Sequence, residues 1–336
     1  MKKFSALSIL LIAGSPVFAQ GAPAESAAAE NAPSSVSLFV ENDFKFSDRY
    51  YTNGIKLTYA DYGDDWWASA AQFAVLRAVG LDSDQAWQTA SIGQNMCVGY
   101  DITDPNPPLD DRPYAGWLYL SSGAHLVKKD SLDSLTVTLG IVGPQSYAGD
   151  VQRAFHDIID DPDPQGWRNQ IKNEPGIVIA YCHAERLFEY AFSENFKSDF
   201  IGAAGANLGN VITEGRIKAL FRIGFNLPNS FSEKRIDYSS SADVYYFDPA
   251  AADWHLYLYA GATARFVGYD ITLNGNTFAD SRSVDPKWLV GEGNLGVSAK
   301  YKNLELSLNW TIRSEEFNTQ RGGPHFFWCA NARVLF

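Results

Sequence analysis

Five polar residues could do chemistry together, although they lie far apart along the chain: Asn42, Asp43, Thr52, Gln152 and His156. Histidine side chains in general titrate near neutral pH, so His156 is a candidate for exchanging a proton with a water molecule or an alcohol. An aspartate beside an amide oxygen suits a hard cation such as calcium, which takes oxygen ligands. The sequence contains no twelve-residue calcium-binding loop, so the residues alone leave the metal open.

Simpler interpretations of the same residues stay open. A single histidine in a loop helix is more often exposed or structural than catalytic, and an Asn-Asp pair also forms turns. What favours chemistry at His156 is the company of the other four residues. A serine nucleophile is not indicated, because the sequence has no G-x-S-x-G motif and GPQSYAG at 143–149 has the wrong spacing.

The composition of the 336-residue chain excludes several classes of protein. The chain carries 27 Lys and Arg against 39 Asp and Glu, a formal net charge of −12, which is opposite to the basic surface of a nucleic-acid-binding protein. The hydrophobic content of 46% excludes wholesale disorder. Aromatic residues at 14%, together with 27 glycines, favour β structure over a helical bundle.

The beginning of the chain indicates export. Residues 1–19 have the pattern of a secretory signal peptide, in which Lys2 and Lys3 precede an apolar stretch and a small-residue cleavage site. Residues 20–33 are Ala-rich and polar without periodicity, which predicts a flexible lead-in. No later segment approaches eighteen consecutive apolar residues, so no transmembrane helix is expected.

From residue 34 to residue 336 the dominant signal has a period of two. In residues 303–313, for example, leucines, Trp310 and Ile312 alternate with polar residues, so the two sets must fall on opposite faces of a strand. The last such segment, residues 325–336, ends with an aromatic residue on its apolar face, which is typical of outer-membrane barrels. About twelve such segments occur, and many are long enough to cross a bilayer when tilted.

These segments predict a closed barrel. An exported chain with apolar-out, polar-in strands has to close on itself, because lipid tolerates no unpaired strand edge. An even number of strands also suits a bacterial barrel whose two ends meet. We therefore predict an all-β fold, a twelve-stranded antiparallel transmembrane β-barrel over residues 34–336, with short helices in an extracellular loop. A soluble secreted β-sandwich is the alternative.

Two segments break the strand pattern. Residues 66–80 have helical spacing and are expected to pack against the membrane or the barrel rim. Residues 150–171 are also expected to be helical, because apolar residues recur at positions i, i+3 and i+4 in VQRAFHDII. Asp150 is the residue expected to cap the start of this helix.

The topology predicts that polar clusters meet at one rim of the barrel. With a periplasmic amino terminus, the connection after every odd-numbered strand is extracellular. Four polar clusters then converge on the outer rim: residues 41–43, 51–53, 110–112 and 152–156. We therefore expect them to form one site despite their distance in the sequence.

The period of two also predicts which of these side chains face the barrel lumen. In the second strand, Thr52 has the parity of Lys56 and is expected inside, whereas Tyr51 has the parity of Ile55 and is expected outside. Asp43 has the parity of the inward residues of the first strand. The alternation therefore predicts that Asp43 and Thr52 both point toward the lumen.

At these positions the sequence resembles a known family. The motifs are VENDF at 40–44, RYYTNGIKL at 49–57, DRPYAGWLYL at 111–120, GIVGP at 140–144 and VQRAFHDII at 151–159. In this order they are similar to the outer-membrane lipid A 3′-O-deacylase family, over nearly the whole chain from residue 34 onward. The resemblance implies a twelve-stranded barrel with a site facing the outer leaflet, calcium dependence, and removal of the ester-linked acyl chain from the distal glucosamine of lipid A.

The resemblance also implies roles for individual residues. His156 would be the general base that activates water. Asn42 and Asp43 would lie at the calcium ion and the reacting carbonyl, with Thr52 close by. A divalent cation at such a site can polarise an ester carbonyl and stabilise the oxyanion, while the histidine transfers the proton. The implied reaction is therefore consistent with the chemistry of the residues.

Two further positions, Gln152 and Arg112, are implied as supporting residues or substrate contacts. The implied partners are lipid A or lipopolysaccharide and the other lipids of the outer membrane; a monomer is expected, and no nucleic acid. The second outer loop, GYDITDPNPPLDD at 99–111, is acidic, although family members can carry a Lys/Arg pair there. This departure leaves open a phospholipase-like acyl hydrolase. A third alternative is a non-enzymatic pore or binding barrel, although bulky inward residues such as Tyr257 and Arg265 argue against a wide channel.

Overall fold

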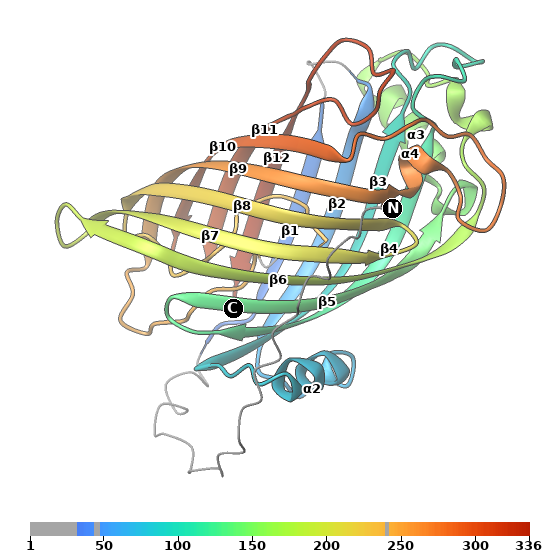
Figure 1. Cartoon of the computed structure of the whole chain (residues 1–336). Coiled ribbons are helices and arrows are strands. Elements are labelled where there is room, and N and C mark those ends of the chain that lie inside the picture. Colours follow the sequence, from blue (N-terminus) through green and yellow to red (C-terminus); the bar gives the residue numbers. More distant parts are fainter. Residues whose placement is uncertain (1–31, 44–47, 239–241) are drawn as a thin grey trace, which may run out of the picture.

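The computed structural model of the chain describes residues 32–43, 48–238 and 242–336. Within these residues, twelve antiparallel strands form a closed barrel in which each strand pairs with its neighbours in the sequence and the last strand pairs with the first (Figure 1). The predicted all-β barrel is thus confirmed. The proposed signal peptide and most of the proposed lead-in lie outside the described residues.

The strands follow one another around the barrel in chain order. Their bounds are β1(Ser35–Asn42), β2(Tyr50–Tyr62), β3(Gln85–Val98), β4(Ala115–Val127), β5(Ser131–Val142), β6(Glu174–Ala191), β7(Phe196–Gly209), β8(Ile212–Phe225), β9(Trp254–Asp270), β10(Leu289–Tyr301), β11(Leu304–Arg313) and β12(His325–Leu335). The barrel closes where β1 and β12 pair antiparallel, from Ser35 opposite Leu335 to Asn42 opposite Trp328. The start of β1 and the end of β12 therefore lie at the same end of the barrel.

The outer face of the barrel is apolar and the inner face is polar. In β11, Leu306 and Trp310 are 52% and 44% exposed, whereas Glu305 and Asn309 are 1% and 0% exposed. A soluble sheet would bury the first pair and expose the second. This inverted alternation is what a strand needs when lipid covers one side and the barrel lumen lies on the other.

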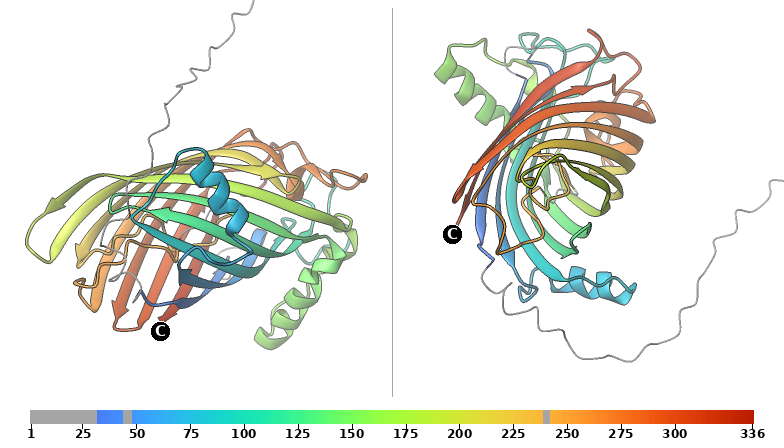
Figure 2. Two further views of the ribbon diagram at one scale, coloured as in Figure 1. Left: turned by 90° about the horizontal axis from the view of Figure 1, so that it is seen from below. Right: turned by 90° about the vertical axis from the view of Figure 1, so that its left-hand side faces the viewer.

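The connection between β8 and β9 enters the lumen and fills part of it (Figure 2). Arg235 donates to Glu292 on β10 over 2.7 Å, and the backbone N–H of Ile236 donates to Glu41 on β1 over 2.8 Å. Lys234 forms an ion pair of 3.0 Å with Glu305 on β11. Because these contacts hold the connection inside the lumen, the structure does not favour the pore alternative.

The end of the barrel opposite the two described chain ends carries the connections after the odd-numbered strands; we call it the outer end. Its longest described connection, between β5 and β6, holds the 3-10 helix η1(Pro144–Ser146), the helix α3(Ala148–Ile159) and the 3-10 helix η2(Gly166–Asn169). Figure 2 shows α3 projecting from the side of the barrel. A short helix, α4(Ile271–Asn274), follows β9 at the same end.

The helix predicted for residues 66–80 is present but shorter, as α2(Ala70–Ala78). Its Phe73 and Leu76 pack against Ala124 and Leu126 on the lipid side of β4, so the expected packing on the barrel is confirmed. Among the described residues, none of the helices has the length and apolar character that crossing a membrane requires.

The prediction of one continuous helix over residues 150–171 was wrong in two respects. The helix begins earlier, at Ala148, after Tyr147 in the left-handed region, and Asp150 lies in the first turn without capping it. It ends at Ile159, where Asp160 again adopts a left-handed conformation with φ of 56°. Proline at 162 and 164 then prevents helix from continuing, because proline lacks the N–H that a helix interior needs.

Candidate active site

A pocket on the outside of the barrel wall brings four of the predicted site residues together. It lies between α3 and the outer ends of β1, β2 and β3, and its cavity is about 200 Å³. We call it the lateral pocket. Its apolar lining consists of Val40, Ile55, Met96, Val151, Phe155 and Ile159. Its polar lining consists of Asn42, Asp48, Thr52, Asn53, Gln152, His156 and Asp161.

A β-bulge places Thr52 in this pocket and corrects the predicted parity. The pairing of β2 with β3 shifts register between Tyr51 and Asn53. Tyr51 consequently points into the lumen, where its hydroxyl donates to Glu41 over 2.7 Å, and Thr52 faces the lateral pocket. A bulge inserts one extra residue into a strand and re-aims the side chains beside it, which strict alternation does not anticipate.

Close packing holds α3 against the barrel. A Cβ on Gly149 would lie 2.8 Å from the Trp167 ring, and one on Gly116 would lie 2.4 Å from the Cβ of Ala148, so both glycines are needed for this approach. The Trp167 indole N–H donates to Oε1 of Gln152 over 2.7 Å. These contacts hold α3 at its first turn and at Gln152. His156 lies one turn after Gln152 and is therefore held in a fixed position.

His156 presents one basic nitrogen to the lateral pocket. Its Nδ1 lies 2.6 Å from the carbonyl oxygen of Pro162, which can only accept, so Nδ1 carries the proton. The other nitrogen, Nε2, is left with a lone pair and lies 3.6 Å from Oδ2 of Asp48. The side chain is 5% exposed. With Nδ1 donating to Pro162, Nε2 is the nitrogen of His156 that can accept a proton at the polar end of the pocket.

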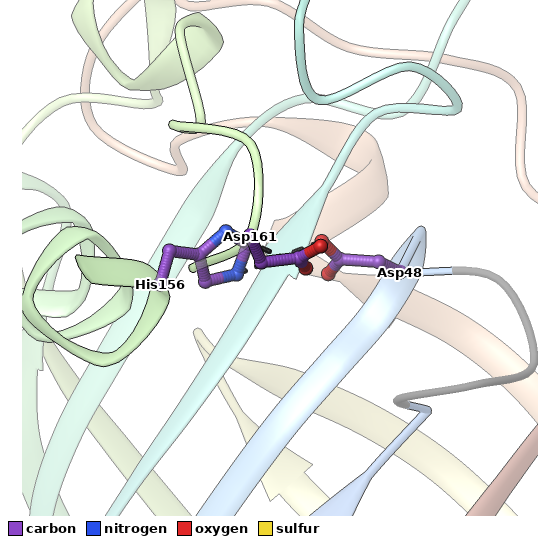
Figure 3. A group of neighbouring side chains, drawn as sticks. All are labelled: Asp48, His156 and Asp161. Atoms are coloured by element: carbon purple, nitrogen blue, oxygen red, sulfur yellow. Dashed lines mark ion pairs between the residues drawn. The ribbon is translucent and has the colours of Figure 1, made fainter. Parts of the chain in front are cut away.

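The carboxylates of Asp48 and Asp161 lie next to each other beside the imidazole of His156, and the three side chains point toward one another (Figure 3). Their ligand atoms all lie within 4.8 Å of one another, close enough for a single metal ion. Two carboxylates are oxygen donors of the kind that calcium takes. Sequence analysis named Asn42 and Asp43 for the metal and missed Asp48 and Asp161; the acidic residues just before β2 and just after α3 were the available signal.

Thr52 connects the two aspartates of the first outer loop. Its hydroxyl lies 2.7 Å from Oδ1 of Asp48 and 3.0 Å from Oδ1 of Asp43, so the two carboxylates share one donor. The backbone N–H of Arg49 donates to Oδ2 of Asp43 over 2.7 Å. Burial raises the pKa of the Asp48 carboxyl above its ordinary value, while the Thr52 hydroxyl and the His156 imidazole act in the opposite direction.

Replacing Thr52 with valine is expected to weaken metal binding. The variant keeps the shape of the side chain but removes the donor shared by Asp48 and Asp43, and partners of metal ligands contribute about 10- to 100-fold to affinity or activity. We expect the concentration of calcium, the ion that the sequence suggests, at which the site is half-saturated to rise roughly tenfold. A calcium-binding titration checks this, with Thr58→Val, a buried threonine of β2 that points into the lumen, as the matched control.

Arg112 lies away from the lateral pocket. Its guanidinium forms an ion pair of 2.6 Å with Glu316 and donates to the Thr272 hydroxyl over 2.7 Å, on the luminal side of the barrel. The side chain is 2% exposed. Arg112 thus shares the luminal side with Glu41 and Tyr51 and is separated from Asn42, Thr52, Gln152 and His156, which line the lateral pocket. This position gives no support for Arg112 as a substrate contact.

Comparison with known families decides what kind of barrel this is. The model of the family described as outer membrane protein LpxR matches residues 6–328. The chain belongs to the LpxR family. This is the lipid A 3′-O-deacylase family that the motifs indicated, and membership together with the barrel fold places the chain in the bacterial outer membrane. No curated protein matches the sequence.

One solved structure supports the same fold. LpxR from Salmonella typhimurium matches with a TM-score of 0.73 and 19% sequence identity, over 90% of this chain and 100% of that chain. The beta domain of the Bordetella autotransporter Brka matches with a TM-score of 0.43 and 12% identity, over 91% of this chain and 99% of that chain. The first of these likenesses shows that the present chain has the fold of an LpxR barrel.

Proposed function

We propose that the protein hydrolyses the 3′-linked acyl or acyloxyacyl ester of lipid A in the outer leaflet of the outer membrane, with calcium as cofactor. Membership of the LpxR family supports the role of an outer-membrane lipid A deacylase. The observation that carries the proposal is the position of His156, whose free Nε2 lies at the polar end of an apolar pocket on the lipid side of the barrel.

The lateral pocket is suited to a substrate that stays in the membrane. Ile55 on β2 and Phe155 on α3 line the pocket, and each keeps more than two fifths of its surface exposed. Ile158 on the same helix is 81% exposed. An acyl chain can therefore lie along this wall without leaving the apolar phase, and its ester reaches His156 where the lining becomes polar.

Three residues have separate roles in the proposed hydrolysis: His156, Pro162 and Asp48. Nε2 of His156 takes a proton from water, which then attacks the ester carbonyl carbon. The hydrogen bond from Nδ1 to Pro162 keeps the ring in position, and the carboxylate of Asp48, 3.6 Å from Nε2, stabilises the imidazolium that forms. The same nitrogen returns the proton to the sugar oxygen as the alcohol leaves.

The donor set at the pocket fits calcium. Asp48, Asp161 and the neighbouring Asn42 offer the oxygen atoms that this ion takes, whereas a histidine nitrogen is not a preferred ligand. We therefore assign the ion to the oxygen donors and leave His156 as the base. When bound, calcium would polarise the ester carbonyl and stabilise the negative charge on its oxygen.

Gln152 offers a second group that can stabilise the oxyanion. Its Oε1 accepts from the Trp167 indole, which can only donate, so the NH₂ group faces away from Trp167. This Nε2 is buried and has no hydrogen-bond partner among the described residues. A buried, unpaired donor at the edge of the pocket is available to the carbonyl oxygen of a bound ester.

Gln152 would have two functions: its Oε1 accepts from Trp167 and so helps to hold α3, and its NH₂ group would donate to the ester. Changing Gln152 to glutamate separates them. The new carboxylate still accepts from Trp167, so α3 stays in place, but the donor is lost. We expect kcat to fall roughly tenfold, less than the 10²–10³ of a dedicated oxyanion donor because the metal shares the charge. Single-turnover rates with lipid A measure the effect. Gln165→Glu, in an exposed position of the same connection, is the control, and equal rates for Gln152→Glu and wild type would contradict the role.

Substrate comparison tests the proposed reaction. The purified barrel is incubated with calcium in separate detergent micelles containing lipid A or phosphatidylethanolamine, and the products are identified by mass spectrometry. We expect lipid A to lose one 3′-linked acyl or acyloxyacyl group, with phosphatidylethanolamine unchanged. Release of fatty acid from phosphatidylethanolamine alone would favour the phospholipase-like alternative and contradict the proposal.

A further inference from the structure

The helix α2 lies beside the barrel wall rather than beyond its end. It belongs to the connection between β2 and β3, at the end of the barrel opposite the outer end, and it lies outside the wall (Figure 1, Figure 2). Nε2 of Gln72, in the first turn of α2, donates to the carbonyl oxygen of Ser122 over 3.3 Å. Ser122 lies five residues before Val127, the last residue of β4. Because a strand rises about 3.3 Å per residue, this contact lies roughly 16 Å along β4 from its end.

The face of α2 that points away from the barrel is apolar. We call residues 66–80 the α2 segment. Phe73 and Leu76 are buried against the barrel, whereas Val75 and Val79 are 53% and 70% exposed and Trp67 is 91% exposed. Between positions 70 and 79 the other exposed residues are Ala70, Ala71, Ala74, Arg77 and Ala78. A helix between protein and water carries polar residues on its outer face, whereas a helix that is apolar on both faces needs an apolar environment.

The part of the barrel wall that lies under the α2 segment carries polar side chains, and the segment covers them. Gln88 on β3 pairs opposite Ala124 on β4, on the face against which α2 packs. The side chain of Gln88 is 0% exposed, and its Oε1 accepts from the backbone N–H of Trp66 over 2.9 Å. The Ser122 hydroxyl donates to the carbonyl oxygen of Ala68 over 2.9 Å. Polar groups that face lipid without a partner are costly, so the α2 segment replaces a polar stretch of the outer face with an apolar one.

Charged residues of this region lie at the end of the barrel. Arg77 pairs with Asp64, which follows the last residues of β2, and Lys128, in the turn after β4, pairs with Asp82. All four side chains are at least 40% exposed. The apolar surface therefore lies beside the wall and the ion pairs lie at the rim. A bilayer has the same order, with hydrocarbon inside and polar headgroups at its border.

We propose that the α2 segment is embedded in the periplasmic leaflet of the outer membrane, where Trp67, Val75 and Val79 contact the acyl chains of phospholipids. The outer face of the same strands continues this surface, because Leu120 on β4 and Leu139 on β5 pair opposite each other and are 62% and 55% exposed. The connection between β2 and β3 thereby gains a role as a membrane anchor beside the barrel. This inference goes beyond the proposed function, since it concerns neither the lateral pocket nor the reaction.

Spin-label accessibility in vesicles tests the proposal. The full barrel carries Val75→Cys or Val79→Cys, is labelled with a nitroxide after folding, and is reconstituted in phosphatidylethanolamine and phosphatidylglycerol. The native cysteines are free and buried, so wild type treated in the same way gives the background. Collision of the label with oxygen, which enters hydrocarbon, is compared with collision with a polar nickel chelate. We expect the oxygen-to-nickel ratio at both positions to be roughly tenfold above that of a label in water, because the polar chelate is excluded from hydrocarbon.

Two further positions calibrate the measurement. Leu295→Cys, on the lipid face of β10 and 63% exposed, should give the same high ratio as the two valine positions. Ala250→Cys, exposed in the connection between β8 and β9, should give the low ratio of a label in water. Frequent collision with the nickel chelate at positions 75 and 79 would place this face in water. Rare collision with both reagents would indicate that a second copy or another protein covers it, and either result would overturn the proposal. The experiment contains neither lipid A nor calcium, so its outcome is independent of deacylation.

Discussion

Replacing His156 with alanine is expected to lower the rate of lipid A deacylation by roughly 10²–10⁴-fold, the contribution typical of a general base. The reason is that Nε2 is the basic atom that the structure places at the polar end of the lateral pocket, since Nδ1 donates to Pro162. The residue lies on α3, outside the barrel wall, so the barrel should still fold. Initial rates of fatty acid release, followed by mass spectrometry, measure the effect.

His183 provides the control for this prediction. It lies on β6, is half-buried, and contacts Asp133 with its Nδ1 over 2.9 Å, so it resembles His156 in having a carboxylate nearby. We expect His183→Ala to deacylate lipid A at the wild-type rate. A His156→Ala protein that folds and retains the wild-type rate would remove the proposed base from the mechanism.

Changing Asp48 to asparagine should raise the calcium concentration needed for half-maximal activity by more than about 100-fold, beyond the range typical of groups that only support a ligand. The substitution removes a charged oxygen donor from the cluster with Asp161. It also removes the carboxylate that faces Nε2 of His156 at 3.6 Å, so kcat at saturating calcium should fall as well. Calcium titrations of the initial rate separate the two effects.

Asp157 is a suitable comparison for Asp48. It is an exposed acidic residue on α3, one position after His156, and it lies outside the group of ligand atoms formed by Asp48, His156 and Asp161. Asp157→Asn has the same change of charge and should leave the calcium titration unchanged. Equal shifts in the Asp48 and Asp157 variants would indicate a general effect of surface charge and contradict the assignment of Asp48 to the metal.

The barrel could be predicted from the sequence because its cause is local and repeated. Each strand must present apolar side chains to lipid and polar ones to the lumen, so alternation such as that of β11, from Leu304 to Arg313, recurs along the whole chain. A pattern repeated this often tolerates individual exceptions. The lateral position of α3, in contrast, depends on the contact of Gly149 with Trp167, which no periodicity reveals.

The site could be predicted only in part, because its geometry depends on two local irregularities. The bulge between Tyr51 and Asn53 moves Thr52 from the lumen to the lateral pocket, and strict alternation cannot detect an inserted residue. The left-handed conformation of Asp160 ends α3 and turns Asp161 back toward His156. Backbone conformations of single residues are not visible in a periodic pattern, so Asp161 was missed.

Arg112 shows a second limit of prediction from the sequence. The strand topology correctly predicted that Arg112 lies in an outer connection. It did not predict whether the side chain faces the lumen or the lipid side of the barrel wall. The structure shows that its guanidinium pairs with Glu316 on the luminal side, whereas His156 lies on the lipid side. Residues at the same rim can thus belong to separate environments, and the side on which each one lies follows from tertiary packing.

The most direct test of the proposed function is mass spectrometry of lipid A after incubation with the purified barrel under three conditions: with calcium, with EDTA, and with EDTA followed by excess calcium. We predict loss of one 3′-linked acyl or acyloxyacyl group in the first and third conditions and intact lipid A in the second. Intact lipid A in all three conditions, or equal deacylation with EDTA, would contradict calcium-dependent hydrolysis at the lateral pocket.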